Sequence, residues 1–247
     1  MEWPDYYADS SCHDLKRFFD CFLKKDLNNG WLATPKVRLA ILNFGLSGLD
    51  DTVNRAENEF PLARTEYRKL YLTPDQAMSR SPSAKQGQVT YDSKNGNAKF
   101  QYRIPDDMET TGYFIARLAV SASSDNDMDL FVHVSCLRGR SSSKQGVLTI
   151  RPDNAMLLKM LKLMHDWQVG LRGVGMLFRW GPSGQLRVSH GQERSELSTT
   201  FEPLYRHTER VTLTPSEIRV VDIPLRPYGM YWKVRTNLQR LDFAALK

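Results

Sequence analysis

The chain has 247 residues, of which 41% are hydrophobic and 25% are charged, a composition typical of a folded globular protein and not of a disordered one. Its formal net charge is +6, but the basic residues are scattered and no RNA-binding or zinc-finger spacing accompanies them, so we expect no nucleic acid partner. No apolar run is long enough for a membrane span, no signal peptide opens the chain and the three cysteines make an odd count, so we expect a cytoplasmic protein with reduced thiols and no membrane partner.

The first predicted element is a helix within residues 10–31. Its apolar residues recur at helical spacing and form one stripe, which consists of Leu15, Phe18, Phe19, Phe22 and Leu23. Ser11 and Asp14 fit a capping box at the start, and Asn28-Asn29-Gly30 is typical of a helix end. A stripe of this size needs a surface that covers it. We expect the chain's own sandwich to do so, with a second copy or a partner chain as the alternatives.

Short apolar runs separated by turns follow the helix. The predicted strands are 35–44, 67–72, 88–92, 98–104, 112–120, 128–137, 147–151, 185–190, 209–214, 217–225, 229–234 and 238–246. Residues 73–87 are polar, contain two prolines and are typical of a linker. Many strands at regular spacing with few helices predict a mainly β fold, an antiparallel sandwich or jelly roll.

A methionine-rich segment, residues 152–168, interrupts the strand pattern. Its apolar residues follow a helical stripe: Met156, Met160, Leu163, Met164 and Trp167. One interpretation is a helix that covers the open side of the sandwich. The other is a flexible lid on an apolar pocket, because methionine packs well against irregular ligands.

The motifs of the common catalytic centres are absent from the sequence. The Gly-x-Ser-Gly-like stretches at 45–49 and 181–185 fail the spacing of a nucleophile elbow. The aspartates of "DNDMD" (125–129) have EF-hand-like spacing, but Leu130 stands where glycine is needed and Cys136 where glutamate is needed. That stretch therefore predicts a loop entering a strand, and we expect neither a metal nor a cofactor.

Several segments in chain order resemble one family. They are "DLKRFFDCFLKKDLNNGW", "TPKVRLAILNFG", "ENEFPLARTEYRKLYL", "TGYFIARLAVSASSDNDMDLFVHVSCL", "GPSGQLRVSHGQERSELSTTFEPLYRH" and "TPSEIRVVDIPLRPYGMYWKV". Together they resemble the C-terminal half of the Xaa-Pro dipeptidyl-peptidase and cocaine-esterase group of hydrolases. In that group an α/β-hydrolase domain carries a Ser-Asp-His triad, and a C-terminal jelly roll of galactose-binding type packs against it.

The resemblance implies a division of this chain into two parts. Residues 1–84 correspond to the C-terminus of the hydrolase domain, a helix plus short strands packed on the sandwich, and residues 85–247 to the jelly roll. The family's triad belongs upstream of the opening helix, and His13 does not match its histidine, so no triad residue is transferred. Two departures are Ser216, where the family usually has glycine, and residues 138–180, which have no clear counterpart.

Two functions of different classes are compatible with these observations. The first is a non-hydrolytic, cofactor-free enzyme that binds an apolar small molecule and promotes its cyclisation by holding the reactive conformation, a Diels–Alder-type cyclase of natural-product biosynthesis. The second is a non-catalytic accessory module, or the jelly-roll half of a split hydrolase, whose phenylalanine stripe is the interface. Either function is compatible with a homo-oligomer.

A pocket in the sandwich would use a small set of polar and apolar side chains. We expect catalytic roles for His133 and His190, substrate contacts for Arg117, Met164, Trp167 and Tyr231, and no metal ligand. The alternative for each is a structural role. His190 ends a predicted strand, and the charge of Arg117 on its strand needs solvent or a partner.

Overall fold

The computed structural model describes residues 7–44, 51–93, 95–138, 143–148, 156–157, 159–160, 178–232 and 239–246. The chain forms two compact units, Met1–Ala63 with Val147–Arg179 and Arg64–Gly146 with Trp180–Lys247. No helix in the described part of the chain is long and apolar enough to cross a membrane. The family resemblance predicted a different division of the chain, into a hydrolase-domain remnant (1–84) and a jelly roll (85–247). That division stays a prediction.

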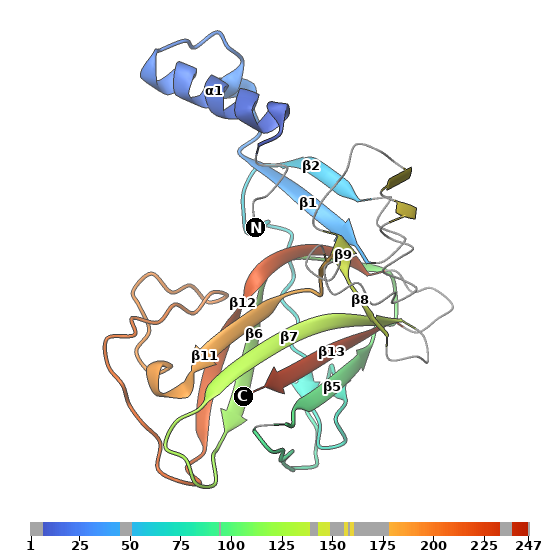
Figure 1. Cartoon of the computed structure of the whole chain (residues 1–247), viewed down its shortest axis with the longest axis vertical. Helices are drawn as coiled ribbons and strands as arrows, with labels where there is room; N and C mark the ends of the chain where they lie inside the picture. The colour runs from blue at the N-terminus through green and yellow to red at the C-terminus, as the bar shows by residue number, and fades with distance from the viewer. Residues whose placement is uncertain are drawn as a thin grey trace. The chain divides into compact units, whose positions relative to one another are not determined.

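The first unit opens with the expected helix, α1 (Asp9–Leu23), shown in blue in Figure 1. The predicted capping box is wrong, because the N-cap position falls on Ala8, whose side chain makes no capping hydrogen bond. Asp14 instead accepts hydrogen bonds from Arg17 (3.2 Å) and Arg38 (2.5 Å). The helix also ends earlier than expected, and Gly30, with φ of 76°, precedes the short 3-10 turn Trp31–Ala33 instead of ending α1.

Two antiparallel strand pairs complete the described part of the first unit. β1 (Val37–Asn43) pairs with β2 (Thr52–Glu57), and β9 (Val147–Leu148) pairs with β10 (Phe178–Arg179). The expected strand at 35–44 is therefore confirmed, and the one at 147–151 is confirmed in part. Of the expected helix at 152–168, the described residues Met156, Leu157, Lys159 and Met160 are helical and exposed. The remainder, with Met164 and Trp167, lies outside the described residues.

The second unit is a sandwich of antiparallel sheets. One layer contains β6 (Met108–Val120) and β12 (Arg219–Trp232), which pair along nearly their whole length. The other has the order β11-β7-β13-β5, with β8 (Ser143–Gln145) on the side of β7. Its strands are β5 (Ala98–Arg103), β7 (Asp129–Arg138), β11 (Ser183–Arg187) and β13 (Gln239–Leu246), drawn in front of β6 and β12 in Figure 1. The mainly β, jelly-roll-like prediction is confirmed.

Some predicted segments differ in detail. The linker at 73–87 contains β4 (Met78–Ser79), which pairs with β3 (Tyr71–Leu72) after a turn closed by the Thr73 side chain. Residues 88–92 and 209–214 form no strand. In the second stretch, the N–H of Val211 bonds to Ser189 and that of Leu213 to Asn126. These backbone N–H groups are hydrogen-bonded to loop carbonyls and not to a neighbouring strand, so the alternating apolar pattern does not produce a strand here.

The core lies between the two layers of the second unit. Alternate residues of the strands are buried there: Ala116 and Leu118 of β6, Val132, Val134 and Cys136 of β7, and Val221, Ile223 and Leu225 of β12. Trp232 at the end of β12 is fully buried, and its indole N–H donates to the Thr110 hydroxyl at 2.8 Å. A period of two in buried residues is what a sheet with one face in a core requires.

Two glycines allow a close approach of strands in this unit. A Cβ atom on Gly184 of β11 would lie 2.2 Å from the carbonyl oxygen of Pro224 on β12. A Cβ on Gly181, whose φ is 135°, would lie 2.3 Å from the carbonyl oxygen of Val134. In the stretch 181–185, which has the wrong spacing for a nucleophile elbow, Gly184 therefore serves packing between the two layers and Gly181 serves packing against β7 within one layer.

Replacement of Gly184 by alanine is expected to lower the free energy of unfolding by about 1–3 kcal/mol, because two backbones must separate to admit the methyl group. Urea unfolding followed by circular dichroism measures this loss. The matched control is Gln185→Ala, an exposed neighbour on the same strand, with an expected change within about 0.5 kcal/mol. Equal stability of Gly184→Ala and the wild type would contradict the packing role.

Candidate functional site

The best-defined polar cluster of the second unit is centred on Asp222, near the start of β12. Its neighbours Val221 and Ile223 point into the core, so the Asp222 side chain lies on the opposite face of the sheet. Directly across the ladder stands Arg117 of β6. The Arg117 guanidinium donates from Nε to Oδ1 at 2.7 Å and from Nη2 to Oδ2 at 2.8 Å, a bidentate cross-strand ion pair.

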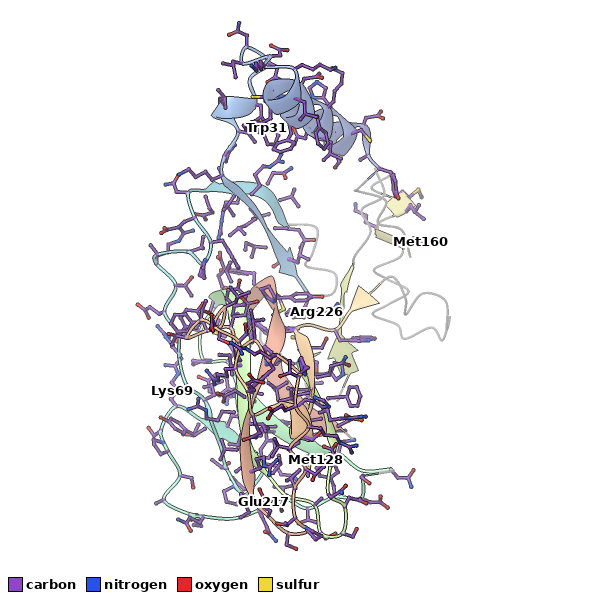
Figure 2. All side chains as sticks on the ribbon, turned by 90° about the vertical axis from the view of Figure 1, so that its left-hand side faces the viewer. Trp31, Lys69, Met128, Met160, Glu217 and Arg226 are labelled. Atoms are coloured by element: carbon purple, nitrogen blue, oxygen red, sulfur yellow. The ribbon has the colours of Figure 1, made fainter. Side chains whose placement is uncertain are left out.

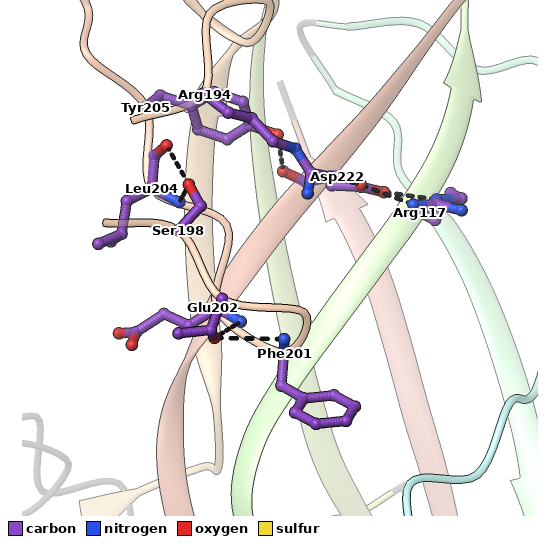
Figure 3. A network of polar contacts seen from close by, with 9 residues as sticks. Arg117, Arg194, Ser198, Phe201, Glu202, Leu204, Tyr205 and Asp222 are labelled. Atoms are coloured by element: carbon purple, nitrogen blue, oxygen red, sulfur yellow. Dashed lines mark hydrogen bonds and ion pairs between the residues drawn. The ribbon is translucent and has the colours of Figure 1, made fainter. Parts of the chain in front are cut away.

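A loop of residues 191–207 supplies further contacts of Asp222, one to its carboxylate and one to its main chain (Figure 3). Arg194 donates from Nη2 to the same Oδ2 atom, and the Tyr205 hydroxyl donates to the Asp222 main-chain oxygen at 2.7 Å. Arg194 and Tyr205 also form an isolated antiparallel bridge with each other. We call Arg117, Arg194, Tyr205 and Asp222 the Asp222 cluster.

Burial is distributed unevenly over this cluster. The Asp222 side chain is 8% exposed, whereas those of Arg117 and Arg194 are 73% and 45% exposed. The hydrogen bonds from Arg117, the largest influence, hold the pKa of the Asp222 carboxyl below its ordinary value of 3.8 against the opposing effect of burial. Burial also raises the pKa of the Tyr205 phenol above 10.0. The cluster is therefore an ionised carboxylate under two guanidinium groups that reach solvent.

The 191–207 loop is also held by its own polar side chains. The Ser198 hydroxyl donates to the Leu204 carbonyl at 2.9 Å and accepts from the Leu204 N–H at 3.0 Å. The Phe201 ring stacks on Tyr67, with interplanar angle 3° and ring centroids 3.5 Å apart. Internal hydrogen bonds and a stacked aromatic anchor give the loop one defined position over the sheet.

The two histidines predicted to act in catalysis occupy different places. His133 lies half-buried on β7, opposite Ser183 at the start of β11. His190 ends a 3-10 turn, Val188–His190, that follows β11, and not the strand that the sequence predicted. About 13 Å of strand, at roughly 3.3 Å per residue, separates the two ends of β11. The structure thus does not bring these histidines together, and their roles stay predictions.

The remaining predicted contact residues also lie apart. Tyr231 faces Glu109 at one end of the β6–β12 ladder, whereas Arg117 faces Asp222 toward the other end. Met164 and Trp167 lie outside the described residues. Of the four predicted residues that the structure describes, Arg117 alone belongs to the Asp222 cluster. The sequence signal that could have led to Asp222 is its carboxylate within the apolar run "VVDIPL", because a charge in a buried strand needs a partner.

The aspartate-rich stretch 125–129 has a structural explanation. Asp127 accepts hydrogen bonds from the Ser189 hydroxyl (2.7 Å), the Ser189 N–H (3.1 Å) and the Met128 N–H (3.0 Å). Burial favours the neutral form, but these bonds outweigh it and hold the pKa of Asp127 below 3.8. Asp129 pairs with Arg187. In the part of the chain that the structure describes, no three metal-binding side chains gather at one place.

The first unit presents an apolar surface on α1. The stripe residues Phe19 and Phe22 are 50% and 55% exposed, and Leu23 is 75% exposed. Phe18 contacts Trp31 edge-on, with ring centroids 5.4 Å apart, and Figure 2 labels Trp31 next to the helix. One aromatic residue therefore covers part of the stripe, but all five of its members, including Leu15 (41%) and Phe18 (38%), stay exposed. Exposed apolar patches of this kind mark interaction surfaces.

The second unit is thus a β-sandwich in which the two histidines predicted to act in catalysis, His133 and His190, lie apart. The family of the X-Pro dipeptidyl-peptidase C-terminal non-catalytic domain matches residues 29–231, and the chain belongs to this family. The resemblance deduced from the sequence is thus confirmed. No curated protein sequence matches the chain.

Solved structures agree with this assignment. Two crystal structures of a CocE/NonD family hydrolase from Staphylococcus aureus are 27% identical to this chain, with TM-scores of 0.77 and 0.78. The similarity covers 99% of this chain and 39% of the hydrolase chain. An aminopeptidase from a marine sediment archaeon, Thaumarchaeota archaeon, shares the fold at 14% identity and a TM-score of 0.57, over 94% of this chain and 36% of its own. The chain therefore spans well under half the length of these relatives.

Proposed function

We propose that this chain is the non-catalytic C-terminal part of a serine hydrolase and supports an α/β-hydrolase catalytic domain. That domain is carried either on the same polypeptide or on a separate one. The family match supports the proposal, as does the hydrolase of which this chain covers 39%. The single observation that carries it is the exposed stripe of α1.

The stripe has the properties of a contact surface. Phe19, Phe22 and Leu23 each expose half or more of their surface, although aromatic and leucine side chains are usually buried in a folded domain. Aromatic residues dominate the binding energy of protein interfaces. The stripe therefore favours an apolar surface of the catalytic domain as its partner, which was one alternative of the sequence analysis.

The predicted cyclase activity stays a prediction. Nothing in the described part of the chain favours it, and two of its predicted wall residues lie outside that part. Fold membership does not decide function, so the cyclase is a separate hypothesis with its own test. Alanine variants at His133 and His190 that keep full activity on a polyene substrate would exclude these residues from such a reaction.

Active-site labelling tests the proposed function. A fluorophosphonate probe labels the activated serine of a serine hydrolase. We expect no label on the isolated 247-residue chain, with the CocE/NonD family hydrolase from Staphylococcus aureus as the positive control. In cells of the source organism, the label is expected on a serine outside these 247 residues, in material that co-purifies with the tagged chain. A labelled serine within the chain would overturn the proposal.

The stripe itself is tested by Phe19→Asp. We expect the variant to stay folded, because Phe19 is half-exposed, and to weaken association with the labelled catalytic domain by about thirtyfold, or about 2 kcal/mol. Where both parts share one polypeptide, the expected readout is a lower melting temperature of the whole enzyme.

Ile218→Asp is the matched control for this variant. Ile218 is a 73% exposed apolar residue of the second unit, so its replacement is expected to leave association unchanged. Unfolding of the isolated chain by Phe19→Asp would show that the chain covers its own stripe and would contradict the proposed interface.

A further inference from the structure

We infer that the Asp222 cluster is a binding site for a carboxylate group attached to an apolar or aromatic group. The inference does not depend on the proposed function, because every residue in it belongs to the second unit and none belongs to α1. It rests on the hydrogen-bonding capacity, the charge and the apolar surroundings of Arg117 and Arg194.

The two guanidinium groups keep donors for a second anion. A guanidinium carries five N–H donors and no acceptor. Arg117 directs Nε and Nη2 at Asp222, and Arg194 directs Nη2 at the same carboxylate. The Arg117 side chain is nevertheless 73% exposed and that of Arg194 45% exposed. A ligand can therefore reach the guanidinium groups without breaking the bonds to Asp222.

The charge of the cluster favours an anion. The guanidinium groups of Arg117 and Arg194 share the single carboxylate of Asp222, so the cluster carries a net charge of about +1 at the protein surface. The buried carboxylate also holds both guanidinium groups in place before a ligand arrives. Pre-organised side chains lose less conformational entropy on binding, which raises affinity. A carboxylate matches the planar fork of arginine.

Exposed apolar side chains lie on the strand and the loop that carry the two arginines. Ile115 lies two residues before Arg117 on the same face of β6, and is 39% exposed. Leu204 and Phe201 of the 191–207 loop are each 36% exposed, and Figure 3 shows Leu204 near Tyr205 and Phe201 lower on the loop, away from Arg117. Exposed apolar groups next to arginines are typical of recognition surfaces. These neighbours favour a carboxylate with an apolar or aromatic substituent over a small inorganic anion.

The direct test is a titration of the ¹⁵N-labelled 247-residue chain at low salt, followed by the arginine Nε–H signals. The probes are N-acetylphenylalanine and N-acetylphenylalaninamide, which differ in the carboxylate. We expect shifts of the Arg117 and Arg194 signals with millimolar affinity for the acid and at least fivefold weaker binding of the amide. A capped phenylalanyl-glutamate dipeptide amide then shows whether a side-chain carboxylate binds more tightly than a terminal one.

Arginine variants separate binding from stability. Arg117→Gln and Arg194→Gln are each expected to weaken binding of N-acetylphenylalanine at least fivefold. Arg117→Lys keeps the charge but loses the fork, so it is expected to fold and to bind less tightly than the wild type. Thermal unfolding of each variant shows whether the second unit remains folded.

Arg187→Gln is the matched control. Arg187 forms a bidentate pair with Asp129, at 2.7 Å for each bond, and lies on β11, outside the Asp222 cluster. Its replacement is expected to leave binding unchanged. Equal affinity for the acid and the amide, no shift of the Arg117 signal, or an equal loss of affinity in Arg187→Gln would each overturn the inference.

Discussion

Replacement of Trp232 by alanine is expected to lower the free energy of unfolding by about 3–5 kcal/mol, the largest effect of any substitution considered for this chain. Trp232 is fully buried at the end of β12, beside the equally buried Met230. The substitution removes the indole from the core and also leaves the Thr110 hydroxyl without the indole donor at 2.8 Å. Small domains are stable by about 5–15 kcal/mol, so the variant is expected to be only marginally folded.

Urea unfolding followed by far-ultraviolet circular dichroism measures this loss without relying on tryptophan fluorescence. Val220→Ala is the matched control, because Val220 lies on the same strand and is 59% exposed. Its replacement is expected to change the free energy of unfolding by at most about 0.5 kcal/mol. A loss below about 1 kcal/mol for Trp232→Ala would show that the end of β12 is not part of the cooperative core.

Replacement of Asp222 by alanine is expected to lower the free energy of unfolding by about 1–3 kcal/mol. The substitution removes the acceptor that joins Arg117 of β6 to Arg194 of the 191–207 loop. Both guanidinium groups reach water, so their rehydration limits the loss. Hydrogen exchange of the loop amides is expected to become faster along with the loss of stability, because the carboxylate ties the loop to the sheet.

Asp129→Ala provides the control for this variant. Asp129 makes the same bidentate contact with Arg187, at 2.7 Å for both bonds, but its side chain is 41% exposed. Exposed ion pairs contribute about 0–1 kcal/mol, so Asp129→Ala is expected to be close to the wild type. Equal losses in the two variants would mean that the burial of Asp222 adds nothing to its pair.

The pH dependence of this contribution follows from the lowered pKa of Asp222. The folded state holds the carboxyl pKa below 3.8, so the folded state favours the ionised form. The resulting stabilisation is fully present above pH 3.8 and is lost as the pH falls through the lower folded pKa. The difference in free energy of unfolding between the wild type and Asp222→Asn is therefore expected to be constant near neutral pH and to shrink in strong acid.

The regular elements of this protein follow from local patterns in the sequence. The alternation of Val37, Leu39 and Ile41 predicted β1, and the stripe of five apolar residues predicted α1. The pattern failed at 209–214, where backbone groups of Val211 and Leu213 bond to loops instead of a strand. It failed there because the backbone N–H groups find acceptors in neighbouring loops, and of these two apolar side chains Leu213 is buried whereas Val211 is 42% exposed.

The Asp222 cluster depends on contacts that no local pattern contains. The need of Arg117 for a partner is visible in the sequence, because a charge on a strand face must be solvated or paired. Its partner lies 105 residues away and is defined by the register of β6 against β12. A shift of one residue would turn Asp222 into the core, so the cluster exists only in this register.

The sequence by itself determined the class of fold, the family and the presence of an amphipathic helix, because these depend on periodicity and on ordered motifs. The tertiary structure decided which polar residues meet. It placed His133 and His190 at opposite ends of β11, and it joined Arg117 and Arg194 on one carboxylate. The physical reason is that side chains distant in sequence come together through strand register and loop anchoring, which arise only when the whole sandwich forms.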